Sequence, residues 1–334
     1  MNVIEEVGKY HDYAVSMRRE FHKHPELSLA EERTTSDIAN QLDAMNIPYE
    51  RPLKTGLVAT LRGTAPDAYR EDGTPRRRIL LRADIDALPV TEQTGEEFAS
   101  VNEGCMHACG HDAHIAMMLG AAKVLNEVKE ELAGTVICVF QVAEETGFGY
   151  KEVLDYFDSI GGVDSVIGLH IWSTLPEGEI LLIPNSVFAG GVGYDLTVKG
   201  EGGHGGRPDL VKDPIKAACE MVLKFASIPS NFYDVLDHSV VNVGRIEAGT
   251  IGNVFPSEAK LYGGYRWYKP GGDKVILEKM HQIARGVSAM YGVDYELVIN
   301  GGVPPVSNNA ELINRAKGLV KDVDGLELAK QTDP

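Results

Sequence analysis

The stretch GTVICVFQVAEE, residues 134–145, decides the fold class of this chain. A continuous apolar, β-branched run such as 135–142 is typical of a strand that is buried on both faces of a sheet. RILLRADIDALPV at 78–90 and SVIGLHIW at 165–172 predict further strands, the latter also buried, and IAMMLGAAKVLNEVKEEL at 115–132 places its apolar residues on one helical stripe. This alternation predicts an α/β domain with a mostly parallel sheet covered by helices.

The segments before this core continue the pattern. Apolar residues recur at helical spacing in the first fifty residues, and LVATLRG at 57–63 predicts another strand. From about Ala189 the sequence pattern changes to predicted strands in which apolar and polar residues alternate, together with two predicted helices. This pattern predicts a small antiparallel sheet with helices on one face. We therefore expect an inserted α+β domain at 189–301, with 1–188 and 302–334 forming one discontinuous domain.

Composition excludes several classes of protein. The net charge of −17, with no basic cluster longer than Arg76–Arg78, argues against nucleic acid as a partner. No apolar run is long enough to cross a bilayer, and the N-terminus lacks the apolar segment of a secretory signal. Four cysteines in 334 residues do not form a disulfide framework. A cytoplasmic protein without nucleic-acid or membrane partners is expected.

Polar residues follow three of the predicted strands. Asp84 and Asp86 close the strand at 78–90, Glu144 and Glu145 follow the strand at 134–142, and His170 lies near the end of 165–172. The carboxyl ends of parallel strands meet at one edge of a sheet, where the sites of α/β proteins lie. One of the two glutamates can bind a metal while its neighbour accepts a proton from water. The alternatives are a solvated glutamate pair and a core histidine.

CMHACGHDAH, residues 105–114, has the highest density of metal-capable side chains and lies directly before a predicted helix. In an extended chain Cys105 and His111 would be about 20 Å apart, too far to share one ion. Cys109 and His111 are the strongest candidates, because Gly110 permits a close approach. A structural zinc finger would need two more ligands at suitable spacing, which the sequence lacks. His107 and His114 stay open, with supporting or capping roles favoured over ligation.

The chain resembles the M20 family of co-catalytic metallopeptidases, in particular its amidohydrolase branch of aminoacylase, hippurate-hydrolase and auxin-conjugate-hydrolase type. The resemblance rests on MRREFHKHPELSLAEERT, LRADIDALPV, MHACGHDAHIAMMLGAAKVL, VFQVAEE, GLHIW, KGEGGHGGRPD and GNVFPSEAKLYGGYRW. It implies a catalytic α/β domain with two adjacent divalent metal ions and an inserted lid domain that contacts substrate and often forms a homodimer.

The resemblance also implies roles for single residues. Cys109 matches the ligand that bridges the two metals, and His111, Glu145 and His170 match terminal ligands. Glu144 matches the general base, which takes a proton from a metal-bound water, and Asp86 matches the carboxylate behind the metals. A thiolate with imidazoles and carboxylates suits Zn²⁺, Mn²⁺, Co²⁺ or Ni²⁺.

In the lid, the resemblance implies that His204 stabilises the developing oxyanion, in some members across a dimer, and that Asn253 and Arg266 bind substrate. Arg266 suits a carboxylate because its guanidinium can pair with it through two hydrogen bonds. Alternatively, His204 is a turn histidine among glycines and Arg266 is a surface residue with a local acidic partner.

The implied activity is hydrolysis of the amide bond of N-acyl or N-aroyl amino acids or peptides. Family members continue with a strand–helix segment that carries an S-E-D-F-like stretch and a last histidine ligand, and no such stretch follows Val306 here. We therefore expect a catalytic domain without its C-terminal part and a metal site short of one ligand. A dipeptidase or carboxypeptidase, and an impaired homologue that binds ligand or dimerises, are the alternatives.

Overall fold

The computed structural model describes residues 3–323 and 325–330. Contacts between residues divide the chain into two compact units, Met1–Thr174 and Leu175–Pro334. None of the helices in the described ranges combines the length and apolar character that crossing a bilayer requires.

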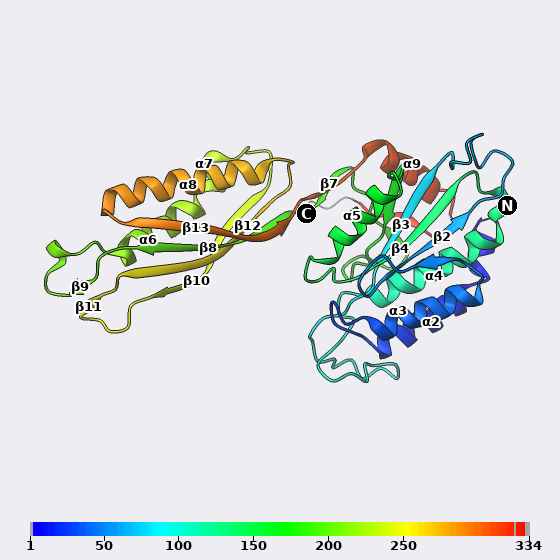
Figure 1. Ribbon diagram of the computed structural model, residues 1–334, viewed down its shortest axis with the longest axis horizontal. Coiled ribbons are helices and arrows are strands. Elements are labelled where there is room, and N and C mark those ends of the chain that lie inside the picture. The colour runs from blue at the N-terminus through cyan, green and yellow to red at the C-terminus, as the bar shows by residue number, and fades with distance from the viewer. Residues whose placement is uncertain (1–2, 324, 331–334) are drawn as a thin grey trace. The chain divides into compact units, whose positions relative to one another are not determined.

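The first unit is built on a five-stranded sheet of order β1-β2-β4-β3-β5 (Figure 1). Strands β4, β3 and β5 run parallel, as predicted, and β2 and β1 continue the sheet antiparallel on the side of β4. The α/β fold is therefore confirmed. The strands are β1 (Tyr49–Glu50), β2 (Leu57–Arg62), β3 (Arg78–Asp84), β4 (Thr135–Gln141) and β5 (Ser165–Gly168).

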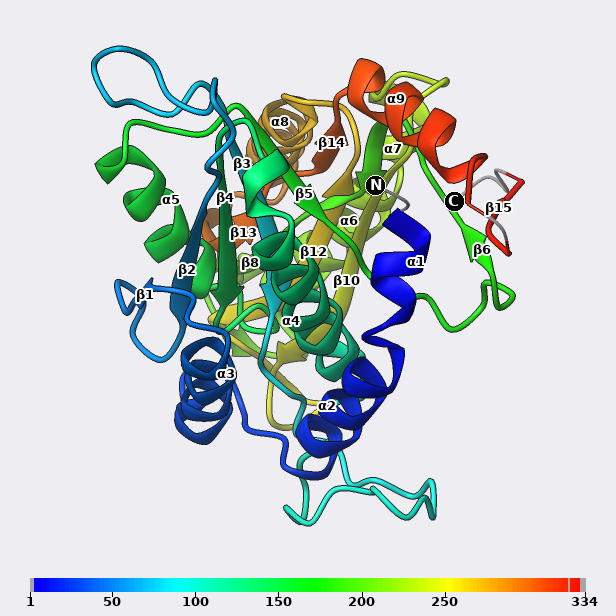
Figure 2. The ribbon, with the colours of Figure 1, turned by 90° about the vertical axis from the view of Figure 1, so that its right-hand side faces the viewer.

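Helices cover both faces of this sheet (Figures 1 and 2). Apolar residues of α2, α3 and α4 pack with one set of alternating strand side chains, and those of α5 pack with the other set. Strand β4 is buried along its whole length because it lies between these two layers. The helices are α1 (Val3–Gly8), α2 (His11–Lys23), α3 (Glu32–Ala44), α4 (His111–Glu127), the 3₁₀ turn η1 (Lys129–Glu131) and α5 (Gly149–Ser159).

The segment 165–172 departs from the prediction of a buried strand. Only Ser165–Gly168 forms β5, and Val166 and Ile167 are 52% and 49% exposed. The physical reason is position: β5 is the edge strand of the sheet and pairs with β3 alone. The sequence pattern of a short apolar run does not distinguish a central strand from an edge strand.

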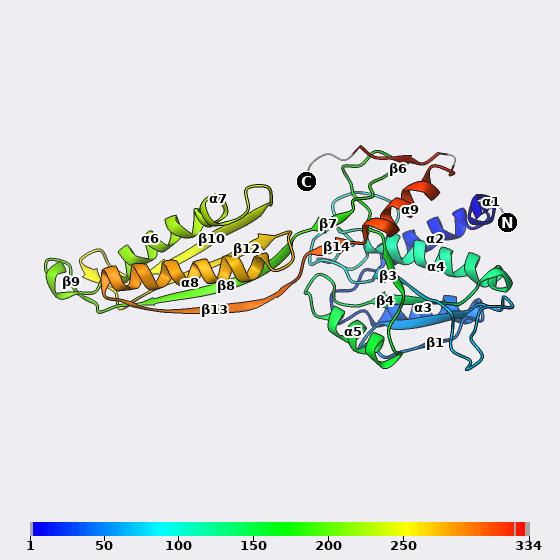
Figure 3. The same cartoon turned by 90° about the horizontal axis from the view of Figure 1, so that it is seen from above.

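The second unit contains the predicted antiparallel sheet, of order β10-β12-β8-β13. Helices α6 and α8 lie side by side and pack against it through a common apolar core (Figure 3). Strand β8 alternates buried and half-buried residues, as expected of a sheet with one covered face. These elements are β8 (Gly190–Lys199), α6 (Pro214–Ala226), α7 (Ile228–Phe232), β10 (Ser239–Ala248), β12 (Glu258–Trp267), α8 (Gly272–Tyr291) and β13 (Asp294–Val303).

Shorter elements complete this unit. Strand β6 pairs in parallel with β15, β7 pairs antiparallel with β14, and β9 pairs antiparallel with β11. Contacts group 175–188 and 302–334 with the second unit, and the discontinuous first domain with an insertion at 189–301 stays a prediction. The elements are β6 (Glu179–Ile180), β7 (Asn185–Phe188), β9 (Gly203–His204), η2 (Pro208–Leu210), β11 (Val254–Phe255), β14 (Val306–Asn308), α9 (Ala310–Val320) and β15 (Glu327–Leu328).

Candidate metal centre

The carboxyl ends of β3, β4 and β5 bring the candidate residues of the first unit to one edge of the sheet. Asp84 ends β3, Glu144 and Glu145 follow β4, and His170 follows β5. His111 is the first residue of α4, whose start lies at the same edge because His111 contacts Asp84 and Asp86. Strands and a helix far apart in the sequence therefore deliver these side chains to one place, as the pattern predicted.

Ligand-capable atoms cluster around His111. One group joins it to Cys109 and His170 and another to Glu144 and Glu145, and within each group these atoms lie within 4.8 Å of one another. The Cys109 Sγ is 3.4 Å from the Nε2 of His170, and the Nε2 of His111 is 3.8 Å from Oε1 of Glu145. The structure thus brings together all five residues for which the resemblance implies ligand or base roles.

Hydrogen bonds fix which nitrogen of each histidine can bind a metal. The Nδ1 of His111 lies 2.9 Å from the carbonyl oxygen of Asp86, and a carbonyl only accepts, so this nitrogen carries the proton. The Nδ1 of His170 donates in the same way to the carbonyl of Ile171, at 2.6 Å. The lone pair of each ring therefore sits on Nε2, the atom that faces the cluster.

Two buried atoms of the cluster are suited to bind a cation. Within the described part of the chain, Nε2 of His111 and Oε1 of Glu145 have no hydrogen-bond partner although both are shielded from water. Two acceptors that face each other without a proton between them are costly in a protein interior unless a cation binds both. The donor set of thiol, imidazole and carboxylate is one that binds divalent transition metals.

His114, whose role the sequence left open, is not available as a ligand. Its Nε2 accepts the N–H of Ile171 at 3.0 Å, so its proton is on Nδ1, which donates to Oδ1 of Asp84 at 2.5 Å. Both ring nitrogens are used, although Asp84, His111 and His114 come close enough to hold an ion. His114 therefore supports the site without binding metal.

The two remaining members of 105–114 lie outside the cluster. The Cys105 thiol is buried and lies 3.5 Å from the carbonyl oxygen of Pro25. His107 is buried, and desolvation lowers its pKa to about 4, so it is neutral.

Asp86 orients the two glutamates. Its carboxylate accepts the backbone N–H groups of Glu144 and Glu145, each at 3.1 Å, and the hydroxyl of Ser28 at 2.6 Å. Burial works against the charged form, but the His111 ring, 3.5 Å from the carboxylate, and the hydrogen bond from Ser28 outweigh it and lower the pKa of Asp86. Asp86 is therefore an ionised residue whose oxygens are already occupied, which fits a position behind the metals.

The cluster concentrates negative charge. Burial and the charge of Asp84 raise the pKa of Glu144, and burial together with Glu145 raises that of the Cys109 thiol to about 12. Burial also opposes ionisation of Asp84, yet the hydrogen bond from His114 and the charge of Arg82 bring its pKa well below the usual value. A bound divalent cation would reverse this for Cys109, because it stabilises the thiolate directly.

Sequence reasoning missed several residues that shape the site. Ala143, just before the glutamates, has a positive φ of 51°, and its N–H donates to the buried carboxylate of Glu31 at 2.9 Å. Non-glycine residues in this region are strained and are found where the surroundings hold them in place. In the sequence Glu31 stands beside Glu32, and its residue type does not distinguish it from this exposed neighbour.

Gly110 allows the tight packing that the sequence suggested. Its φ is 82°, and a Cβ there would overlap the Cδ1 methyl of Ile171. This position therefore needs glycine both for its backbone conformation and for the approach of the segment that carries His170.

The candidate residues of the second unit fall into two places. His204 in β9 pairs with Val254, and the N–H of Gly205 donates to the carbonyl of Asn253 at 2.8 Å, so His204 and Asn253 are neighbours. Arg266 lies eight residues beyond the start of β12 at Glu258, about 27 Å along an extended strand. Its guanidinium packs over Gly191 and donates to the carbonyl of Tyr265, and it has no acidic partner among the described residues.

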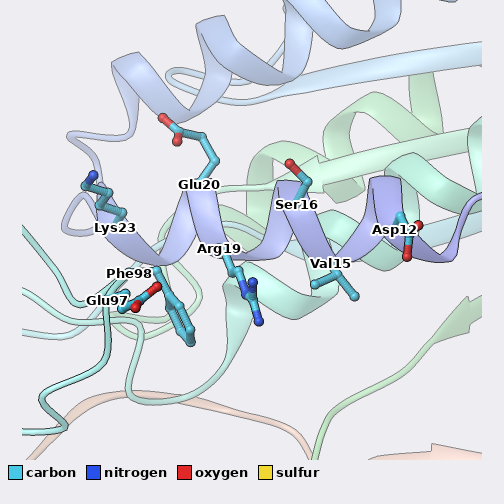
Figure 4. A pocket seen from close by; sticks show the side chains of 8 residues that line it. All are labelled: Asp12, Val15, Ser16, Arg19, Glu20, Lys23, Glu97 and Phe98. Atoms are coloured by element: carbon cyan, nitrogen blue, oxygen red, sulfur yellow. The ribbon is translucent and has the colours of Figure 1, made fainter.

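A surface hollow of about 510 Å³ is lined by residues of α2 together with Glu97 and Phe98 (Figure 4). It runs along α2 and contains none of the candidate site residues. Its lining mixes acidic and basic side chains of an exposed helix face, so it defines no site. The lining residues are Asp12, Val15, Ser16, Arg19, Glu20, Lys23, Glu97 and Phe98.

The fold and the cluster define an α/β protein with a candidate metal centre at the carboxyl edge of its sheet. The family model described as "Peptidase family M20/M25/M40" matches residues 80–334. The chain belongs to this family, and it is a hydrolase of amide bonds.

Individual relatives agree. N-acetylcysteine deacetylase of Bacillus subtilis is 38% identical over 312 residues, which cover 92% of this chain and 79% of that protein. N-acyl-L-amino acid amidohydrolase of Geobacillus stearothermophilus is 35% identical over 298 residues, covering 89% and 78%. The crystal structure of the Bacillus subtilis YXEP protein, a dinuclear metal binding peptidase from the M20 family, has a TM-score of 0.82 at 33% identity, covering 96% of this chain and 82% of that one.

Proposed function

We propose that this enzyme cleaves the amide bond of N-acyl or N-aroyl amino acids and releases the free amino acid. The observation that carries the proposal is the pair of unpartnered acceptors, Nε2 of His111 and Oε1 of Glu145, beside the contact between Cys109 and His170. Relatives that act as a deacetylase and as an N-acyl-L-amino acid amidohydrolase support the substrate class.

Cys109, His111, Glu145 and His170 would hold two divalent ions, Cys109 as the ligand that the family resemblance implies is shared and the other three as terminal ligands. The mixture of thiolate, imidazole and carboxylate favours Zn²⁺, Mn²⁺, Co²⁺ or Ni²⁺ over Mg²⁺ or Ca²⁺. When bound, the ions would polarise the amide carbonyl and make water more acidic.

Glu144 is the general base of the proposal. Asp86 accepts a hydrogen bond from the backbone N–H of Glu144 and makes none with its carboxylate. Glu144 accepts a proton from the attacking water and delivers it to the leaving amine. Burial raises its pKa, so its carboxylate is a stronger base than a solvated one and is suited to accept this proton.

Arg266 is the proposed partner of the substrate's α-carboxylate, because its guanidinium has no acidic partner in the described part of the chain. His204 and Asn253 are proposed to stabilise the oxyanion and to bind substrate. The strand from Glu258 to Arg266 extends over about 27 Å, which is far longer than an N-acyl amino acid. One substrate molecule is therefore too short to span this length of β12. A homodimer through the second unit would let one chain supply Arg266 and the other supply His204 and Asn253.

The four cysteines, none of which forms a disulfide, support a reducing compartment, and we place the enzyme in the cytoplasm.

The test is hydrolysis of N-acetyl and N-benzoyl amino acids by the protein loaded with Mn²⁺ or Zn²⁺, compared with dipeptides that carry a free α-amino group. Turnover of the acylated substrates supports the proposal. Preference for the dipeptides would instead indicate a peptidase, and no turnover of either by metal-loaded protein contradicts it.

A further inference from the structure

His114 connects three segments that surround the ligand cluster. It belongs to α4 and lies one helical turn after His111; its Nδ1 donates to Asp84 at the end of β3. Its Nε2 accepts the N–H of Ile171, the residue directly after His170, and its ring meets that of His170 edge to face at a centroid distance of 4.7 Å.

The segment that carries His170 is held by the hydrogen bond to His114 and by the packing of Ile171 against Gly110. It lies beyond the end of β5, outside regular secondary structure. Its large apolar side chains are substantially exposed, with Leu169 at 56% and Trp172 at 53%, so burial does little to fix them. The Nδ1 of His170 is bonded to the carbonyl of Ile171, so the position of that peptide determines where the Nε2 of His170 points.

We propose that His114 is a positioning residue that sets the place of His170 through the N–H of Ile171 and thereby tunes the affinity for the ion beside His170. Asp84 has the supporting part: its carboxylate holds the proton on Nδ1 of His114, which keeps Nε2 free to accept. The inference rests on the proposed metal site, but the hydrogen bond at its centre exists without metal.

Two isosteric variants separate the contacts. In His114→Gln the side-chain oxygen can take the place of Nε2 and accept from Ile171, while the contact with Asp84 is lost. In His114→Asn the amide nitrogen can take the place of Nδ1 and donate to Asp84, while the contact with Ile171 is lost. His114→Leu removes both, and His281→Leu, a change in α8 that leaves this cluster intact, controls for the loss of a histidine.

The experiment measures two quantities on the full 334-residue chain. The first is the Co²⁺ affinity, followed by thiolate-to-Co²⁺ absorption and metal content. The second, on metal-free protein, is hydrogen exchange of the Ile171 amide. We expect His114→Asn and His114→Leu to weaken one of the two ions by about 10- to 100-fold and to lose protection of the amide, whereas His114→Gln stays near wild type in both.

The inference would be overturned if His114→Asn kept the wild-type Co²⁺ affinity and the wild-type protection of the Ile171 amide. It would also be overturned if His114→Gln lost as much of both as His114→Leu. If the wild-type chain binds no Co²⁺, the proposed function fails and this role in metal affinity fails with it; the exchange data would then still show whether His114 holds the segment. The two failures are therefore distinguishable.

Discussion

The Nδ1 of His111 donates a hydrogen bond of 2.9 Å to the main-chain carbonyl of Asp86. The carboxylate of the same aspartate accepts the N–H groups of Glu144 and Glu145. One residue therefore orients a candidate ligand with its backbone and the proposed base with its side chain. A mutation can therefore affect the base without affecting metal binding only if it leaves Asp86 and its hydrogen bonds in place.

Glu144→Gln is such a change. It preserves the backbone N–H that Asp86 binds but removes the basic carboxylate. We expect full metal content and a fall in kcat on the order of 10²- to 10⁴-fold. Metal analysis alongside steady-state kinetics checks this, and a loss of metal equal to that of a ligand variant would contradict the division of roles.

Cys109→Ala tests the bridging ligand, and Cys105→Ala is its matched control from the same motif. The Cys109 thiol lies 3.4 Å from His170 in the cluster, whereas the Cys105 thiol donates to the carbonyl of Pro25. We expect Cys109→Ala to lose metal and Cys105→Ala to keep it. Metal content after dialysis decides, and equal retention in both variants would remove Cys109 from the ligand set.

Two glycines of the same region are predicted to respond in opposite directions. Gly110→Ala places a Cβ into Ile171 at a positive φ and should cost about 1–3 kcal/mol, with weakened metal binding. Gly120→Ala lies in α4, where the nearest atom to a new Cβ is 3.9 Å away, and should stabilise by about 0.5–1 kcal/mol. Denaturant unfolding of both variants is the measurement; a neutral Gly110→Ala would contradict the packing argument.

Arg266→Ala should raise KM by roughly 10- to 100-fold for substrates with a free α-carboxylate, since hydrogen bonds to charged groups contribute about 1.5–3 kcal/mol. The matched substrate is the same acyl amino acid as its carboxamide, for which the variant and wild type should differ little. An equal rise in KM for both substrates would show that Arg266 does not bind the α-carboxylate.

The buried His22 predicts a pH-dependent term in stability. The hydrogen bond to Asp112, at 2.8 Å, and a second to Glu92 outweigh desolvation and raise the pKa of His22 above 6.5. A raised histidine pKa stabilises the fold fully below the unfolded pKa, and this stability is lost as pH rises through the folded value. His22→Gln should therefore cost about 1–3 kcal/mol near pH 6 and less near pH 9.

Urea unfolding at both pH values measures this difference, with His281→Gln as the control for removal of a histidine. A cost of His22→Gln that grows with pH would have the wrong sign and would refute the ion pair.

Much of the fold was predictable because each central element obeys one strong pattern. Strand β4 is apolar from Val136 to Phe140 and buried throughout, and the helices at α4 and α8 show their apolar stripes. The exposed edge strand β5 could not be separated from a central one, since Val166 and Ile167 have the same side chains in either position. Strand direction likewise depends on tertiary pairing, which the β2 sequence does not encode locally.

The candidate site shows the same division. Cys109, His111, Glu145 and His170 could be proposed from residue type and place in the sequence, and the structure brings them together. The roles of His114 and Glu31 could not, because they depend on hydrogen bonds to backbone groups of Ile171 and Ala143. A backbone group can be a hydrogen-bond partner whatever its side chain is, so such contacts cannot be predicted from residue type.

The metal content of the purified chain tests the central claim most directly. After loading with Co²⁺ or Zn²⁺ and dialysis, the account predicts at least one tightly bound ion per chain, lost on Cys109→Ala and retained on Glu144→Gln. Fewer than one ion per wild-type chain would contradict it.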